Sequence, residues 1–222
     1  PYTPLQHLLL AAAEACGMHA LVMTSGNLSE EPIETDDDLA WEHLVAAGIA
    51  DALLGNDRAI LSRYDDSVMR AANGTVMPVR RARGYAPQPL PLPALDGAPS
   101  CVLACGPQQK ATIALTREGT NGKATCFVSQ HIGDVENGGT FDASNAARTR
   151  LEDLFDLAPA ALACDVHPSY LSSQWAREQT RKCNLPLVEV QHHHAHIASV
   201  MAEAIAAGQL TTDARVLGIA FD

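Results

Sequence analysis

The stretch LVEVQHHHAHIASVMAEAIA, residues 187–206, joins a strand pattern directly to a helix pattern. Residues 187–190 have the pattern of a strand, whereas residues 197–206 are rich in helix formers. If the helix begins at His192, then His192 and His196 lie one turn apart on the same helix face. This predicts an α/β unit that presents two imidazoles at the carboxyl end of a strand, where open α/β sheets bind ligands.

The spacing of this histidine run is compatible with two interpretations. Histidines four residues apart on a helix can offer two ligands to a single metal ion. Adjacent histidines also occur as ordinary polar side chains in a solvated turn. The zinc-protease motif H-E-x-x-H is excluded, because His193 stands where that motif needs the glutamate that acts as general base.

Composition indicates a globular chain of one large or two small domains. Of the 222 residues, 47% are hydrophobic and 18% are charged, which is too apolar for disorder. The formal net charge of −11 disfavours nucleic acid and anionic membranes as partners.

No apolar run has membrane-spanning length and no signal peptide is visible, so we expect a soluble protein. The six cysteines form no C-x-x-C pair, which predicts buried free thiols in a reducing cytoplasm.

A proline-rich connector near residues 86–99 divides the chain into two parts. Before it, periodicity predicts helices at 4–16 and 37–48 and strands at 20–23, 50–54 and 67–81. After it, strands are predicted at 101–105, 112–116, 126–129, 160–165, 187–190 and 216–222, and further helices at 144–155 and 170–182. Asn121-Gly122 predicts a hairpin turn within this second part. The pattern is that of an α/β protein whose second part opens with a β-meander.

Polar segments follow several of the predicted strands. Ser25 and Asn27 lie in a Thr-Ser-Gly-Asn turn, whose hydroxyl, amide and flexible backbone suit a phosphate or carboxylate. Arg80 and Arg81 belong to an arginine cluster in an otherwise acidic region. Guanidinium groups suit phosphate, which is the favoured interpretation; the alternative is a basic strand end that pairs with Asp65 and Asp66. The segments that contain Lys110, His131, and the pair Asp165 and His167 are compatible with turns and helix caps as well as with catalysis.

Together these motifs resemble the HypF carbamoyltransferases, which are maturation factors of nickel–iron hydrogenases. The matching segments occur in the family's order and cover nearly the whole chain: LVMTSGNLSEEPI, RYDDSV, VRRARGYAP, LACGPQQKATIAL, SQHIGDVEN, CDVHPSYLSS and VQHHHAHIASVMAE. The resemblance implies the C-terminal part of a YrdC-like α/β domain at 1–90, a linker at 91–99, and the first lobe of an actin-like ATPase (TsaD-like) domain at 100–222. It also implies that the chain is an interior fragment whose two sites are incomplete and which is inactive by itself.

The activity implied by the resemblance has two steps. Carbamoyl phosphate and ATP, the latter with Mg²⁺, yield carbamoyl-adenylate and pyrophosphate. The carbamoyl group then passes to the C-terminal cysteine of the acceptor protein HypE and later becomes a cyanide ligand of the hydrogenase. Ser25 and Asn27 match a Ser-x-Asn motif that contacts ATP. Arg80 and Arg81 match a phosphate-facing strand end, which leaves open which of them reaches the nucleotide.

The resemblance also assigns the histidine pair. His192 and His196 match a catalytic H-x-x-x-H pair that binds a divalent metal ion, and Asp222 matches a third ligand. Imidazoles with carboxylates suit iron and zinc alike, so the ligand set leaves the metal undecided. The ion would polarise the carbamoyl-adenylate as a Lewis acid. His193 and His194 would point away from the ligands.

Other functions stay open at this stage. An O-carbamoyltransferase of the antibiotic or nodulation type has both domains in the reverse order. A double-stranded-RNA-binding module of the YrdC type is disfavoured by the negative charge and favoured only by the patch of arginines at 80–83. A purely structural scaffold would bind neither metal nor adenylate.

Overall fold

A computed structural model describes residues 3–29, 31–93, 97–119 and 123–221. The elements of the first part are α1 (Pro4–Ala15), α2 (Asp37–Ala40), the π-helix η1 (Trp41–Ala46), β1 (Val68–Ala72), β2 (Thr75–Arg80) and β3 (Pro89–Pro93). Those of the second part are β4 (Val102–Cys105), β5 (Ile113–Glu118), β6 (Lys123–Val128), α3 (Gly138–Phe155), β7 (Ala161–Asp165), α4 (Leu171–Cys183), β8 (Leu187–Val190) and α5 (His192–Ala206). None of the helices in these ranges combines the length and apolarity that crossing a bilayer requires.

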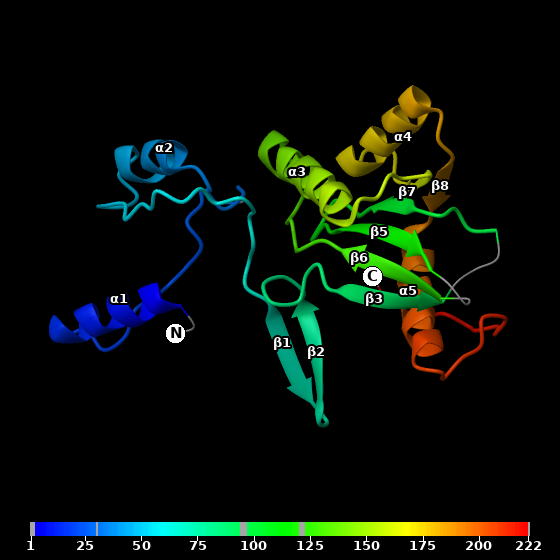
Figure 1. Cartoon of the computed structure of the whole chain (residues 1–222), viewed down its shortest axis with the longest axis horizontal. Helices are drawn as coiled ribbons and strands as arrows, with labels where there is room; N and C mark the ends of the chain where they lie inside the picture. Colours follow the sequence, from blue (N-terminus) through cyan, green and yellow to red (C-terminus); the bar gives the residue numbers. More distant parts are fainter. Residues whose placement is uncertain (1–2, 30, 94–96, 120–122, 222) are drawn as a thin grey trace.

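A six-stranded sheet in the order β3-β6-β5-β4-β7-β8 organises the second part. The first four strands pair antiparallel, whereas β4, β7 and β8 pair parallel. α3 and α4 cover one face of the sheet and α5 lies on the other (Figure 1). The core lies under α3 and α4, where Leu103, Leu115 and Leu162 of the sheet are buried with Leu151 and Ala176 of the helices. The strands and helices predicted between 101 and 206 are thereby confirmed, including the opening meander.

The proline-rich segment expected as a connector forms an edge strand over part of its length. β3 pairs antiparallel with β6 along its whole length. Its three prolines occupy alternate positions, so their missing N–H groups all lie on one side of the strand. Prolines are tolerated in a strand when that side faces away from the neighbouring strand. Leu90 and Leu92 therefore keep the N–H groups that face β6, and residues 91–93 of the predicted 91–99 linker belong to the sheet.

β1 and β2 form a separate hairpin closed by Asn73 and Gly74. These two residues have φ angles of 51° and 76°, the conformation that Asn-Gly supplies to a two-residue type I′ turn. The strand region predicted at 67–81 is therefore two strands, and the Asn-Gly pair is the sequence signal for the turn between them. The second such pair, Asn121-Gly122, lies outside the described residues, although β5 and β6 on either side of it pair antiparallel.

Other strand predictions are wrong within the described residues. Residues 20–23, 50–54 and 216–221 form no strand. Val22 is 96% exposed and Leu217 is 92% exposed. Before Cys101, the only buried side chains described are those of three alanines. Apolar runs become strands only where a neighbouring strand supplies backbone hydrogen bonds, and none lies beside these runs in the described structure.

The prediction of buried thiols is correct for only some of the cysteines. All six are free; Cys101, Cys126 and Cys164 are buried, whereas Cys16 and Cys183 are exposed. Cys16 is the C-cap residue of α1, and Cys183 is the last residue of α4. Burial raises the pKa of Cys126 to about 11, so the buried thiols are poor nucleophiles.

Candidate functional site

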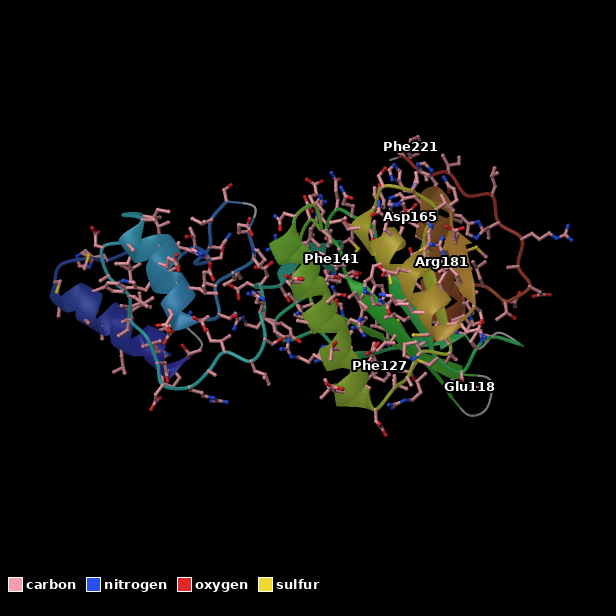
Figure 2. All side chains as sticks on the ribbon, turned by 90° about the horizontal axis from the view of Figure 1, so that it is seen from above. Glu118, Phe127, Phe141, Asp165, Arg181 and Phe221 are labelled. Atoms are coloured by element: carbon pink, nitrogen blue, oxygen red, sulfur yellow. The ribbon has the colours of Figure 1, made fainter. Side chains whose placement is uncertain are left out.

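The carboxyl edge of the parallel strands collects the polar segments. β4 and β7 end there at Cys105 and Asp165, and β8 leads there directly into α5. β6 runs in the same direction as β4, because both are antiparallel to β5, so residues 129–137 reach the same edge. Figure 2 labels Asp165 at this edge and Glu118 at the opposite one. The expectation that the histidine run lies at a strand end is confirmed.

His192 and His196 converge at the start of α5. Gln191 caps this helix, and its side-chain oxygen accepts the N–H of His194 at 2.8 Å. The Nε2 atoms of His192 and His196 are 3.1 Å apart. Nitrogen ligands held about 2.0–2.1 Å from one tetrahedral ion would lie about 3.3–3.4 Å from each other. The geometry of the pair therefore fits a shared metal ion.

Asp165 contacts His192 on the side of the ring away from His196. Its Oδ2 lies 3.0 Å from Nδ1 of His192. Its Oδ1 accepts the backbone N–H of His167 at 2.8 Å. Because a carboxylate only accepts hydrogen bonds, Nδ1 of a neutral His192 carries the proton and its Nε2 presents a lone pair toward His196.

Of the three predicted metal ligands, His192 and His196 are among the described residues. Asp222, the expected third ligand, lies outside the described residues. Within the described ranges, no group of three or more His, Cys, Asp or Glu side chains gathers in a metal-binding arrangement. His193 and His194 are exposed, and Nδ1 of His193 lies 2.6 Å from the side-chain nitrogen of Gln191. His167 stacks on Tyr170 with ring centroids 4.1 Å apart.

A cleft of about 910 Å³ lies between the two parts of the chain. All four residues predicted to bind nucleotide line it: Ser25, Asn27, Arg80 and Arg81. The second part contributes Lys110 and His131 to the opposite wall. The sequence left the roles of Lys110 and His131 open, although both follow strands that end at the same sheet edge. Their shared position in the cleft follows from the antiparallel pairing of β5 with both β4 and β6.

The two predicted arginines have different surroundings. Arg81 donates to the backbone carbonyls of Gln88 at 2.7 Å and Val128 at 3.4 Å. Burial lowers the pKa of its guanidinium. Arg80 has a side chain that is 41% exposed and lies 3.8 Å from the Asp65 carboxylate. Arg81 therefore ties the two parts together, and Arg80 is the better candidate for an anion in the cleft.

The turn predicted around Ser25 and Asn27 is held by the asparagine itself. The amide nitrogen of Asn27 donates to the carbonyls of Leu28 at 2.8 Å and Glu31 at 3.0 Å. Ser25 is exposed at the cleft wall.

Across the cleft, burial and then the charge of Arg80 lower the pKa of His131, so that ring is neutral at neutral pH. The cleft therefore offers a hydroxyl, a guanidinium, an ammonium and a neutral imidazole to an anionic ligand.

Sequence comparison defines the class of protein to which this fold and these sites belong. Residues 97–203 match the family model described as HypF Kae1-like domain, and residues 1–82 match the Sua5/YciO/YrdC model described as telomere recombination. The chain is thus a two-part α/β protein of YrdC-like followed by Kae1-like type, which confirms the expected fold class. It is 42% identical to carbamoyltransferase HypF2 of Cupriavidus necator and 40% identical to carbamoyltransferase HypF of Synechocystis, each over 100% of this chain. The chain belongs to the HypF family.

Solved HypF structures show the same arrangement. A full-length HypF in the phosphate- and nucleotide-bound form is 40% identical, with a TM-score of 0.75 over 92% of this chain and 30% of that one. HypF of T. kodakarensis is 33% identical, with a TM-score of 0.72 over 83% of this chain and 23% of that one. The chain spans 27% of the length of the Cupriavidus relative and 26% of that of the Synechocystis relative.

Proposed function

We propose that this chain supplies two sites of a carbamoyltransferase of hydrogenase maturation. The observation that carries the proposal is the 3.1 Å approach of the Nε2 atoms of His192 and His196, at the sheet edge that also forms one wall of the cleft. Family membership supports it, because the curated relatives are named carbamoyltransferases. The histidine pair is the transfer site, and the cleft is the site of nucleotide chemistry.

The cleft suits the activation step. Carbamoyl phosphate and water give carbamate and inorganic phosphate. An oxygen of the carbamate then attacks the α-phosphorus of ATP, bound with Mg²⁺, to form carbamoyl-adenylate and release pyrophosphate. Arg80 and Lys110 stand on opposite walls, where they offset the negative charge that develops on the leaving pyrophosphate. Ser25 binds the nucleotide by its hydroxyl, and Asn27 holds the turn that presents it.

The histidine pair suits the transfer step. His192 and His196, with Asp222 as the third ligand, would hold a divalent ion, either iron or zinc. When bound, that ion supplies Lewis-acid polarisation of the carbamoyl group. The residues of this chain hold the two imidazoles at a common point and orient them. The thiol sulfur of the C-terminal cysteine of HypE then attacks the carbamoyl carbon, which forms a thiocarbamate and releases AMP and the thiol proton.

Substitutions in the intact protein test the assignment to two sites. Replacing both histidines, His192→Ala with His196→Ala, should abolish carbamoyl transfer to HypE and leave carbamoyl-phosphate-dependent ATP–pyrophosphate exchange largely intact. Ser25→Ala with Asn27→Ala should weaken the exchange instead. His194→Ala, an exposed substitution on the same helix turn, is the matched control and should change neither activity. Loss of exchange and transfer together in the double histidine variant would contradict the proposal.

The alternative functions gain no support from the structure. Of the arginines that favoured RNA binding, Arg81 is engaged by backbone carbonyls and Arg83 pairs with Asp66 at 3.1 Å. The O-carbamoyltransferase alternative has its domains in reverse order, whereas here the YrdC-type match precedes the Kae1-like match.

A further inference from the structure

We propose that Asp165 is the residue that positions His192 to bind metal, an inference that rests on the metal site proposed above. Asp165 is the last residue of β7 and lies opposite Val190 in the parallel register with β8. Helix α5 begins only two residues after Val190. The sheet register therefore brings the Asp165 carboxylate to the first residue of the helix, although the two are 27 positions apart in sequence.

The carboxylate of Asp165 is held in place by its own surroundings. Its side chain is only 9% exposed. One oxygen accepts the backbone N–H of His167 at 2.8 Å, and the Asp165 backbone carbonyl accepts the hydroxyl of Ser173 at 2.9 Å. These contacts lie on β7, α4 and the loop between them, so they do not depend on α5 or on a metal. Asp165 is a preorganised acceptor against which the His192 ring is oriented.

The contact decides which nitrogen of His192 is available. With Oδ2 of Asp165 at 3.0 Å from Nδ1, the proton of a neutral His192 lies on Nδ1. The lone pair then lies on Nε2, the atom that faces His196 at 3.1 Å. The negative charge of the carboxylate also strengthens the ring as a metal ligand. Asp165 acts through His192 and does not itself coordinate the ion.

The test compares metal affinity in the intact protein, with Zn²⁺ alone as the probe in competition with a chromophoric chelator. Asp165→Asn keeps the shape of the side chain but removes its charge, and should raise the Kd for Zn²⁺ about 10–100-fold. ATP–pyrophosphate exchange, which belongs to the cleft, should stay unchanged. Glu189→Gln on β8 removes a neighbouring acid that pairs with Arg177 and is the control expected to bind Zn²⁺ normally.

The outcomes distinguish the role inferred for Asp165 from the metal site on which that inference rests. If Asp165→Asn binds Zn²⁺ as the wild type does while His192→Ala loses it, the metal site stands and the role of Asp165 is overturned. If the wild type and His192→Ala bind Zn²⁺ equally, the metal site itself is overturned. Should Asp165→Asn fail to fold, ¹⁵N NMR of histidine-labelled, metal-free wild type decides the matter. A proton on Nδ1 of His192 supports the inference, and a proton on Nε2 overturns it.

Discussion

The guanidinium of Arg150 donates a hydrogen bond of 2.8 Å to the hydroxyl of Ser62, which lies 88 residues earlier in the chain. The same guanidinium donates to the carbonyl of Leu61. Close by, the amide of Gln130 donates to the carbonyl of Arg63 at 3.1 Å. These hydrogen bonds attach residues 61–63 to the second part of the chain. Arg63 and Asp65 of the same stretch line the cleft. These contacts fix the position of one wall of the cleft relative to the other.

Arg150→Ala should therefore loosen the 61–63 segment. Hydrogen bonds to a charged group contribute about 1.5–3 kcal/mol each when buried, and these lie partly in solvent, so we expect a loss of about 1–2 kcal/mol locally. Trypsin should cleave after Arg63 faster in the variant than in the wild type. Arg181→Ala, an exposed arginine of α4, is the control that should leave the cleavage rate unchanged. An unchanged rate in Arg150→Ala would show that the contacts of Arg150 with Leu61 and Ser62 do not hold the segment.

Arg80 and Arg81 should separate function from stability. Arg80→Ala removes a partly exposed guanidinium from the cleft, so ATP–pyrophosphate exchange should fall about 10²-fold while the melting temperature stays near that of the wild type. Arg81→Ala removes the donor to Gln88 and Val128 and should lower the melting temperature first. Exchange assays and thermal unfolding on both variants check this. The reverse pattern would assign the nucleotide contact to Arg81.

The second part of the chain is more predictable from sequence than the first, for a physical reason. Between 101 and 206, strands alternate with helices, and the side chains that define the pattern, such as Leu115 and Leu162, are buried in one core. In the first part, Val22 and Leu54 give equally apolar runs but remain exposed without a pairing strand. An apolar run predicts a strand only where another strand is available to pair with it.

The candidate site was predictable as a set of segments but not as a set of contacts. The four-residue spacing of His192 and His196 predicts their convergence, because the helix alone determines it. The contact between Asp165 and His192 depends on the register of β7 with β8, which no local pattern encodes. The roles of Arg80 and Arg81 likewise depend on which carbonyls lie nearby.

Gly106 should tolerate no side chain. A Cβ at this position would lie 2.2 Å from the backbone oxygen of Thr112, so alanine must displace the loop between β4 and β5. We expect Gly106→Ala to cost about 1–3 kcal/mol of unfolding free energy and to weaken exchange, because Lys110 stands on that loop. Gly138, the first residue of α3, has open space around its Cβ position. Gly138→Ala should be neutral or stabilising by about 0.4–1 kcal/mol, which makes it the matched control in denaturant titrations.

His131 should make the protein less stable in mild acid. Burial is the largest cause that lowers its pKa, Arg80 and Lys110 add to it, and Asp65 and Asp134 oppose it. The folded state thus favours the neutral ring, whereas the unfolded chain binds a proton near the ordinary value of 6.5. Between that value and the lower folded pKa, the unfolded state holds more protons, so stability present above pH 6.5 is lost as the pH falls through this window.

His131→Gln keeps a neutral polar side chain and removes this titration. The variant should lose less unfolding free energy than the wild type between about pH 7.5 and about pH 5, and the two should change in parallel above pH 7.5. Denaturant titrations of the intact protein across this range give the comparison, and titrations common to both proteins cancel in the difference. Equal losses in the two proteins would mean that His131 is solvated and charged in the cleft. In that case the cleft would present an additional cation to its ligand in mild acid, and ATP affinity would rise as the pH falls.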